Sequence, residues 1–180
     1  MRFLTVTVAL LAATLCACKQ QPSSATNTST LTNSASGEPT YFLTNAQPRL
    51  QTIKLYIGPE ELTTELALTR EQMATGMMWR TNMPEGEAML FAFGQPHRTS
   101  FYMKNTLVPL SAAYIDPDGA ILELHDFQPH NPTPVEAKSD NIQYVLEVPQ
   151  GWFKRHNIST GMTMRSQFGP LKNTFSFKPQ

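Results

Sequence analysis

The sequence predicts a mostly β, α+β domain in which short antiparallel or mixed strands form a partly closed barrel with one or two short helices. Apolar and polar residues alternate in many short segments, which is typical of half-buried strands. Turn residues separate these segments, most clearly at Asp116-Pro117-Asp118-Gly119. Only one segment has a clear helix-start signal. These three observations together favour a compact single domain.

The first residues have the composition of a secretory signal peptide. Arg2 precedes an apolar stretch that ends at Leu15, which is shorter than the about 20 residues that a membrane-spanning helix needs. Leu15 and Ala17 precede Cys18 in an arrangement that resembles the bacterial lipobox, where the cysteine is acylated. We therefore predict a signal peptide over residues 1–17 and a lipid anchor on Cys18. A plain signal peptide cleaved nearby, or an uncleaved anchor, is the alternative.

This reading places the protein in the bacterial cell envelope, exported, lipid-anchored and facing the periplasm or the cell exterior. The chain has two cysteines; cleavage would remove Cys16 and lipidation would consume Cys18. The mature protein would then have no thiol for a disulfide, a thiolate metal site or a nucleophile. The membrane, reached through the anchor, is thus an expected partner.

Residues 18–50 are predicted to form a flexible tether. Ser, Thr, Asn and Ala dominate this part of the chain up to residue 40, and such a composition cannot bury enough apolar surface to offset the entropy of ordering. We place the folded domain at residues 51–170 and a C-terminal tail at residues 171–180.

Strands are predicted along the whole domain. The segment 52–58 alternates Ile53, Leu55 and Ile57, which indicates one face of a sheet. Further strand-like runs occupy residues 63–69, 89–93, 99–104, 112–116, 120–127 and 142–148. Because Asp116 opens and Gly119 closes a turn, residues 111–116 and 120–126 should pair as a hairpin.

One helix is expected after residue 69. Thr69 and Gln72 have the spacing of a capping box, and Met73 and Met77 lie one turn apart on the face that should meet the sheet. The segment 81–86 should end this helix. A second, weaker helical turn is predicted within residues 151–157.

Three blocks of sequence carry a family resemblance: residues 69–93, 100–124 and 144–162. They contain Gly76-Met77-Met78 followed by Arg80, Asn105-Thr106 followed by Pro109-Leu110, and Val145-Leu146-Glu147 followed by Gly151. Over about residues 53–164 the chain resembles the DUF192 family, a bacterial and archaeal domain of unknown function. The resemblance implies a compact, β-rich domain that is commonly exported or membrane-tethered, and it implies no established activity.

The chain departs from the family pattern at two positions. Ala88 stands where the family usually has Gly, and Ser111 stands where an Asp usually follows the Pro-Leu pair. A mechanism that needs that carboxylate therefore has no support in this chain.

Five polar residues form the candidate ligand site. Alternation along the segment 142–148 places Glu147 on a face made of core-type residues, and a buried Glu needs a partner, for which Lys104 or Arg80 is the candidate. In the functional interpretation, Arg80 and Lys104 donate to an anion while Asn105 and Thr106 orient it. In the structural interpretation, the same groups satisfy a bend and neutralise each other.

We therefore expect a binding or accessory module for a small anionic or envelope-derived ligand. The alternatives are a small envelope enzyme with Glu147 as general base and a protein-interaction module of an envelope complex. The sequence has no nucleophile elbow, metalloprotease helix or phosphate-binding loop, which favours a role without catalysis but leaves the enzyme open.

No cofactor is expected, and the case for a metal is weak. Met73 and Met77, with His97 nearby in sequence, are soft ligands that could suit Cu(I), but methionines at core spacings are more often gap-fillers. Lys plus Arg and Asp plus Glu number fourteen each, so the charge pattern does not indicate nucleic-acid binding. The sequence gives no indication of the oligomeric state.

Overall fold

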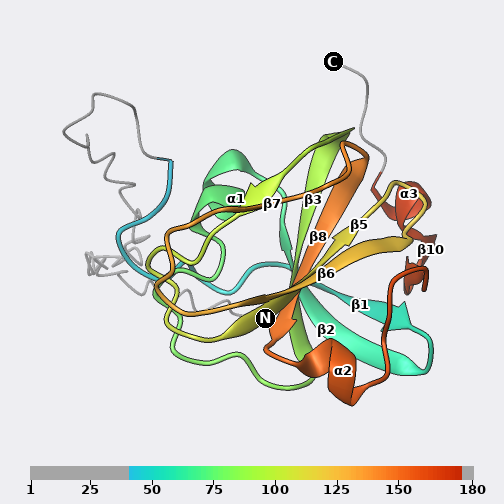
Figure 1. Ribbon diagram of the computed structural model, residues 1–180, viewed down its shortest axis with the longest axis horizontal. Coiled ribbons are helices and arrows are strands. Elements are labelled where there is room, and N and C mark those ends of the chain that lie inside the picture. Colours follow the sequence, from blue (N-terminus) through green and yellow to red (C-terminus); the bar gives the residue numbers. More distant parts are fainter. Residues whose placement is uncertain (1–40, 176–180) are drawn as a thin grey trace, which may run out of the picture.

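The computed structural model describes residues 41–175, and within them the chain forms a mixed eight-stranded sheet, a two-stranded sheet and three short helices (Figure 1). The predicted signal peptide, Cys18 and most of the predicted tether lie outside the described residues. The large sheet has the strand order β10-β9-β1-β2-β3-β8-β5-β6, and β4 pairs with β7. The strands are β1 (Thr52–Ile57), β2 (Glu60–Ala67), β3 (Glu87–His97), β4 (Ser100–Phe101), β5 (Leu110–Ile115), β6 (Ile121–Phe127), β7 (Val135–Glu136), β8 (Ile142–Pro149), β9 (Met164–Ser166) and β10 (Gly169–Pro170). The helices are α1 (Arg70–Thr75), α2 (Trp152–Arg155) and α3 (Leu171–Thr174).

The mostly β class is confirmed, but within residues 41–175 the sheet does not close into a barrel. Strands β10 and β6 are its two edges. The start of β6 meets the segment before β9 through an isolated bridge between Ala120 and Thr163 and through backbone hydrogen bonds, such as that from the Ile121 N–H to the Met162 carbonyl at 2.9 Å. Strands β2 and β3 run parallel while the other paired neighbours are antiparallel, so the sheet is mixed.

Short-range signals in the sequence are confirmed. The Gln72 N–H donates to Thr69 Oγ1 at 3.2 Å, and the Thr69 N–H donates to Gln72 Oε1 at 3.0 Å, which is the expected capping box at the start of α1. Strands β5 and β6 pair as the predicted hairpin. In its turn, the Ala120 N–H donates to Asp116 Oδ1 at 2.8 Å and Gly119 has a φ of 90°, a conformation that glycine adopts without strain.

The strand predicted at residues 99–104 is wrong beyond Phe101. Strand β4 ends there, and the chain becomes a loop because Asn105 has a φ of 60°, a left-handed conformation in which a strand cannot continue. The Thr106 N–H donates to the Met103 carbonyl at 3.0 Å, and the Met103 N–H donates to the Asn131 carbonyl at 2.7 Å. The polar residues after Met103 thus form a bend.

Both faces of the large sheet are buried, and each supports its own apolar cluster. On one face Tyr144, Leu146 and Val148 of β8 pack with residues of β1, β2, α2 and α3. On the other, Val145 of β8 and Phe91 of β3 pack with residues from α1, β4 and β7. Figure 1 shows α1 and β7 on the opposite side of the central strands from α3 and β10. The predicted alternation along β8 is confirmed.

Residues at both ends of the described chain pack against the sheet. The Gln47 side chain donates to the Gly76 carbonyl at 2.8 Å, and the Leu50 N–H donates to Glu65 Oε2 at 2.7 Å. Leu171 of α3 is fully buried. The packed part therefore begins before residue 51 and includes α3. Within these residues, no helix is long and apolar enough to span a bilayer.

Candidate functional site

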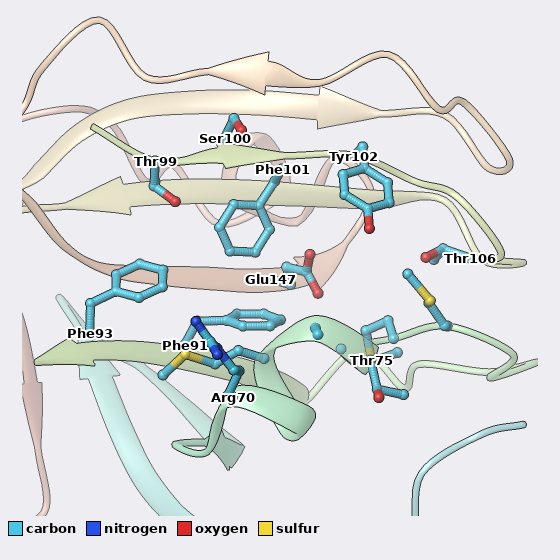
Figure 2. Close-up of a pocket in the computed structure, with 15 residues that line it drawn as sticks. Arg70, Thr75, Phe91, Phe93, Thr99, Ser100, Phe101, Tyr102, Thr106 and Glu147 are labelled. Carbon is cyan, nitrogen blue, oxygen red and sulfur yellow. The ribbon is translucent and has the colours of Figure 1, made fainter. Parts of the chain in front are cut away.

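A pocket of about 480 Å³ opens on the sheet face that α1 covers (Figure 2). Strands β3 and β8 form its floor, α1 and the residues after it form one wall, and the segment that contains β4 forms the other. Its lining residues are Arg70, Met73, Ala74, Thr75, Gly76, Met77, Met78, Phe91, Phe93, Thr99, Ser100, Phe101, Tyr102, Thr106 and Glu147.

The pocket walls are mainly apolar and aromatic. Phe91 and Phe93 extend from β3, and Phe101 from β4 faces Phe91 edge-on with 4.9 Å between the ring centroids. Met73 and Met77 come from one side of α1 and the residues after it, as their spacing predicts. A concave apolar site with a few polar groups is the usual form of a small-molecule site.

Among the described residues, Glu147 is the only acidic one that lines this pocket. It is 5% exposed, and its cross-strand neighbours are Met89 on β3 and Ala112 on β5. Neither neighbour can donate a hydrogen bond through its side chain, and Glu147 Oε2 has no partner among the described residues. Burial raises the pKa of Glu147 to about 8, because an apolar environment disfavours the charged carboxylate. Figure 2 shows this carboxyl beside the rings of Phe91 and Phe101.

Tyr114 lies close enough to Glu147 to influence it. Burial, followed by the charges of Glu147 and Glu123, raises the pKa of Tyr114. Its hydroxyl donates to the Val135 carbonyl at 2.6 Å, so that proton is already engaged. Tyr114 is therefore a neutral neighbour of Glu147 rather than a counterion.

Arg80 and Lys104 do not pair with Glu147, which corrects the partners expected from the sequence. Arg80 forms a two-pronged ion pair with Glu65, from Nη1 to Oε1 at 2.6 Å and from Nη2 to Oε2 at 2.8 Å. Lys104 is exposed, and its Nζ lies 5.4 Å from the centroid of the Phe42 ring. Neither residue lines the pocket.

Glu65 binds Arg80 outside the pocket. Burial alone would raise the pKa of Glu65, but hydrogen bonds from Arg80 and the Leu50 N–H outweigh it and hold that pKa below its usual value. Since Glu65 lies on β2 and Arg80 follows α1, this pair fixes the end of the helical segment to the sheet.

Asn105 and Thr106 have different positions. Thr106 is buried and lines the pocket together with Glu147. Asn105 does not line it; its carbonyl accepts from the Trp79 N–H at 2.8 Å, and its amide contacts Met78 Sδ at 3.9 Å. Of the five candidate residues, the structure thus brings together Thr106 and Glu147 and places Arg80, Lys104 and Asn105 outside the pocket.

Sequence reasoning missed several pocket residues. Arg70 lines the pocket and lies 4.4 Å from the centroid of the Tyr41 ring. Thr75, Thr99 and Ser100 add hydroxyl groups to the lining. In the sequence, only their closeness to the capped helix and to the strand before Asn105 points to these residues. Residues that line a pocket and residues that fill a core show the same alternation, so the pattern cannot distinguish them.

The weak copper candidates divide between two places. Met73 and Met77 line the pocket, whereas His97 lies at the end of β3 with its ring 4.6 Å from that of Phe93. Within residues 41–175, no group of three or more His, Cys, Asp or Glu side chains could hold a metal ion.

A second pocket of about 330 Å³ contains Ser111, His125 and Asp126. Ser111 Oγ accepts from the Gly151 N–H at 2.8 Å and bonds to the Asp126 carboxylate. His125 instead contacts Glu123 Oε2 at 3.1 Å. The Ser111 hydroxyl is therefore engaged by Asp126 and the backbone, and this arrangement does not form a serine–histidine pair.

Comparisons with known proteins agree with this fold. A family model described as "DUF192: Uncharacterized ACR, COG1430" matches residues 53–166. A solved structure described as a candidate transcription regulator, from Sinorhizobium meliloti 1021, is 29% identical with a TM-score of 0.64 and covers 67% of this chain and 98% of its own. A protein of unknown function from Novosphingobium aromaticivorans DSM 12444 is 28% identical with a TM-score of 0.62 and covers 64% of this chain and 86% of its own. No curated protein matches the chain significantly.

Proposed function

The chain belongs to the DUF192 family, and from that premise and the pocket geometry we propose that it is a binding module for a small, mostly apolar ligand whose polar end contacts Glu147. The observation that carries the proposal is the buried carboxyl of Glu147, whose Oε2 has no hydrogen-bond partner among the described residues, in the lining of an open pocket. A buried polar atom without a partner is costly. A ligand that supplies the missing hydrogen bond would recover that cost.

The size and chemistry of the pocket support a small molecule. Its volume of about 480 Å³ is within the range usual for small-ligand sites. Phe91, Phe93 and Phe101 offer aromatic surface, and Thr106 offers a hydroxyl at the same site.

The same geometry weakens the case for an anionic ligand. Glu65 already neutralises Arg80, and Lys104 is exposed outside the pocket. Within residues 41–175, Arg70 is the only cationic residue in the lining. An anion would therefore meet a carboxyl at the centre of the site without a pair of cations to hold it.

We further propose that this binding domain works in the bacterial envelope, tethered to a membrane through acylated Cys18. The signal-like segment before Cys18 supports this location. An envelope-derived ligand is consistent with it.

An enzyme with Glu147 as general base is the second candidate. The observation that favours it is the pKa of Glu147, raised to about 8 by burial, since an acid–base group works best with a pKa near the operating pH. If the bound molecule is chemically changed on incubation with the wild-type protein and unchanged with Glu147→Gln, the enzyme is favoured over the binding module.

The direct test is to fill the pocket and ask whether a ligand is lost. Ala74 lines the pocket from α1, whereas Glu71 on the same helix is exposed. We expect small molecules extracted from purified wild-type protein and identified by mass spectrometry to be absent from Ala74→Trp, because the indole would occupy their volume. Glu71→Trp is the matched control and should retain them. Equal extracts from wild type and Ala74→Trp, both folded by circular dichroism, would refute the proposal.

A further inference from the structure

We propose that the ligand of this pocket is an organic ammonium ion, that is, a protonated amine carried on an apolar body; this inference rests on the proposed function. The pocket combines a buried carboxyl, whose Oε2 has no hydrogen-bond partner among the described residues, with the aromatic rings of Phe91 and Phe101 beside it. An ammonium group suits both features, since it pairs with a carboxylate and is attracted to aromatic faces.

The arrangement of the rings supports a cation more than a neutral donor. Phe91 and Phe101 pack edge to face against each other, and Figure 2 shows the Glu147 carboxyl beside the two rings. The negative faces of aromatic rings add attraction for a cation that a hydroxyl or amide would not gain. Phe93, Met73 of α1 and the two methionines that follow this helix supply surface for the apolar body.

The surrounding charges leave room for one positive charge. On β5, Tyr114 is neutral and its hydroxyl is bonded to Val135. On α1, Arg70 lies against the Tyr41 ring, and Tyr102, which follows β4, is 39% exposed. Within the described residues, no Lys, Arg or His forms an ion pair with Glu147. The ammonium would be the counterion that the fold does not supply.

Binding of an ammonium ion would release a proton. Burial holds the empty-pocket pKa of Glu147 at about 8, so near pH 7 the carboxyl is mostly protonated and must ionise to form the ion pair. The proton leaves to solvent while the ammonium keeps its own. For a pKa of about 8, the affinity should be roughly 50-fold higher at pH 8 than at pH 6.

The test compares two probes of the same shape, 2-phenylethylamine and 2-phenylethanol, by isothermal titration calorimetry on the full-length protein. We expect the amine to bind more tightly than the alcohol at pH 8, with an affinity that falls toward pH 6. Its heat should depend on the ionisation enthalpy of the buffer, which reports the released proton. The alcohol should show neither dependence.

Glu147→Gln keeps the shape of the side chain and removes the charge. It should lose the preference for the amine, the pH dependence and the proton release, while still binding the alcohol. Glu71→Gln removes a carboxylate from an exposed position on α1 and should behave as wild type.

The outcomes separate the two proposals. If the alcohol binds as well as the amine and both bind equally to Glu147→Gln, the ammonium inference is wrong and the binding module stands. If neither probe binds to wild type at any pH, both proposals fail.

Discussion

Glu147 gives the domain an unusual pH dependence. Its pKa is raised from 4.5 to about 8 by burial, so between these values the folded protein holds a proton that the unfolded chain has lost. The free energy of unfolding must then fall as the pH rises through this window, because stability decreases wherever the folded state binds more protons. The apolar neighbours Met89 and Ala112 disfavour the charged form of Glu147 and so cause this loss of stability.

We expect Glu147→Gln to stabilise the protein progressively from pH 5 to pH 8. At about 1.4 kcal/mol per pKa unit, the gain near pH 7 is at most roughly 3 kcal/mol, and it should vanish below pH 4.5. Urea unfolding of both proteins across this range measures it. A difference that does not vary with pH would mean that Glu147 has a partner or reaches water.

Asn105 and Thr106, two polar residues that follow Met103, have different roles. Met103 is buried, but the sequence could not tell whether the polar residues after it form a bend or a ligand platform. The φ of 60° at Asn105 shows that Asn105 serves the backbone, since Asn tolerates this conformation better than most residues. Thr106, next to it, lines the pocket. Adjacent polar residues therefore have different roles.

At the scale of elements, the pair of Glu65 on β2 and Arg80 after α1 holds the helical segment to the sheet. The side chain of Glu65 is 5% exposed and that of Arg80 is 15% exposed. Glu65 also accepts from the Leu50 N–H, so three separate segments meet at one carboxylate. Removing one member of a buried pair leaves an uncompensated charge and is strongly destabilising.

We expect Arg80→Met to lower the free energy of unfolding by about 3 kcal/mol. Arg49→Met is the matched control: Arg49 also approaches Glu65, at 3.9 Å, but its side chain is 57% exposed, and exposed pairs contribute about 0–1 kcal/mol. Chemical denaturation near pH 7 compares the two. Equal effects for both variants would show that the Arg80 pair has no special role.

The elements that the sequence predicted well depend on neighbouring residues. The capping box of α1 and the β5–β6 hairpin each arise within a few residues of chain. The partner of Arg80 could not be predicted in this way, because both Glu65 and Glu147 alternate into buried faces and only the tertiary fold decides which is near. For the same reason the pocket aromatics could not be distinguished from core.

At the scale of the whole molecule, the two faces of the large sheet have different roles. One face is filled by the cluster that includes Trp152, Phe153 and Leu171 from the C-terminal helices. The other face bears the pocket. The pattern predicted burial on both faces of β8, but closure into a barrel depends on how strands distant in sequence meet, and here β6 and β10 remain edges. Substitutions on the pocket face can thus change ligand binding without disturbing the apolar cluster on the opposite face.

The proposed anchor determines where the whole molecule works. We expect the mature N-terminus to be acylated Cys18, because Leu15 and Ala17 precede it as in a lipobox. Since each buried CH₂ contributes about 0.8 kcal/mol and stable anchoring takes more than one chain, the wild type should fractionate with membranes. Cys18→Ala should lose the acyl groups and that association. Cys16→Ala is the control and should stay lipidated, because cleavage removes Cys16. Mass spectrometry of the N-terminal peptide decides: an unacylated N-terminus at any other residue would rule out the anchor.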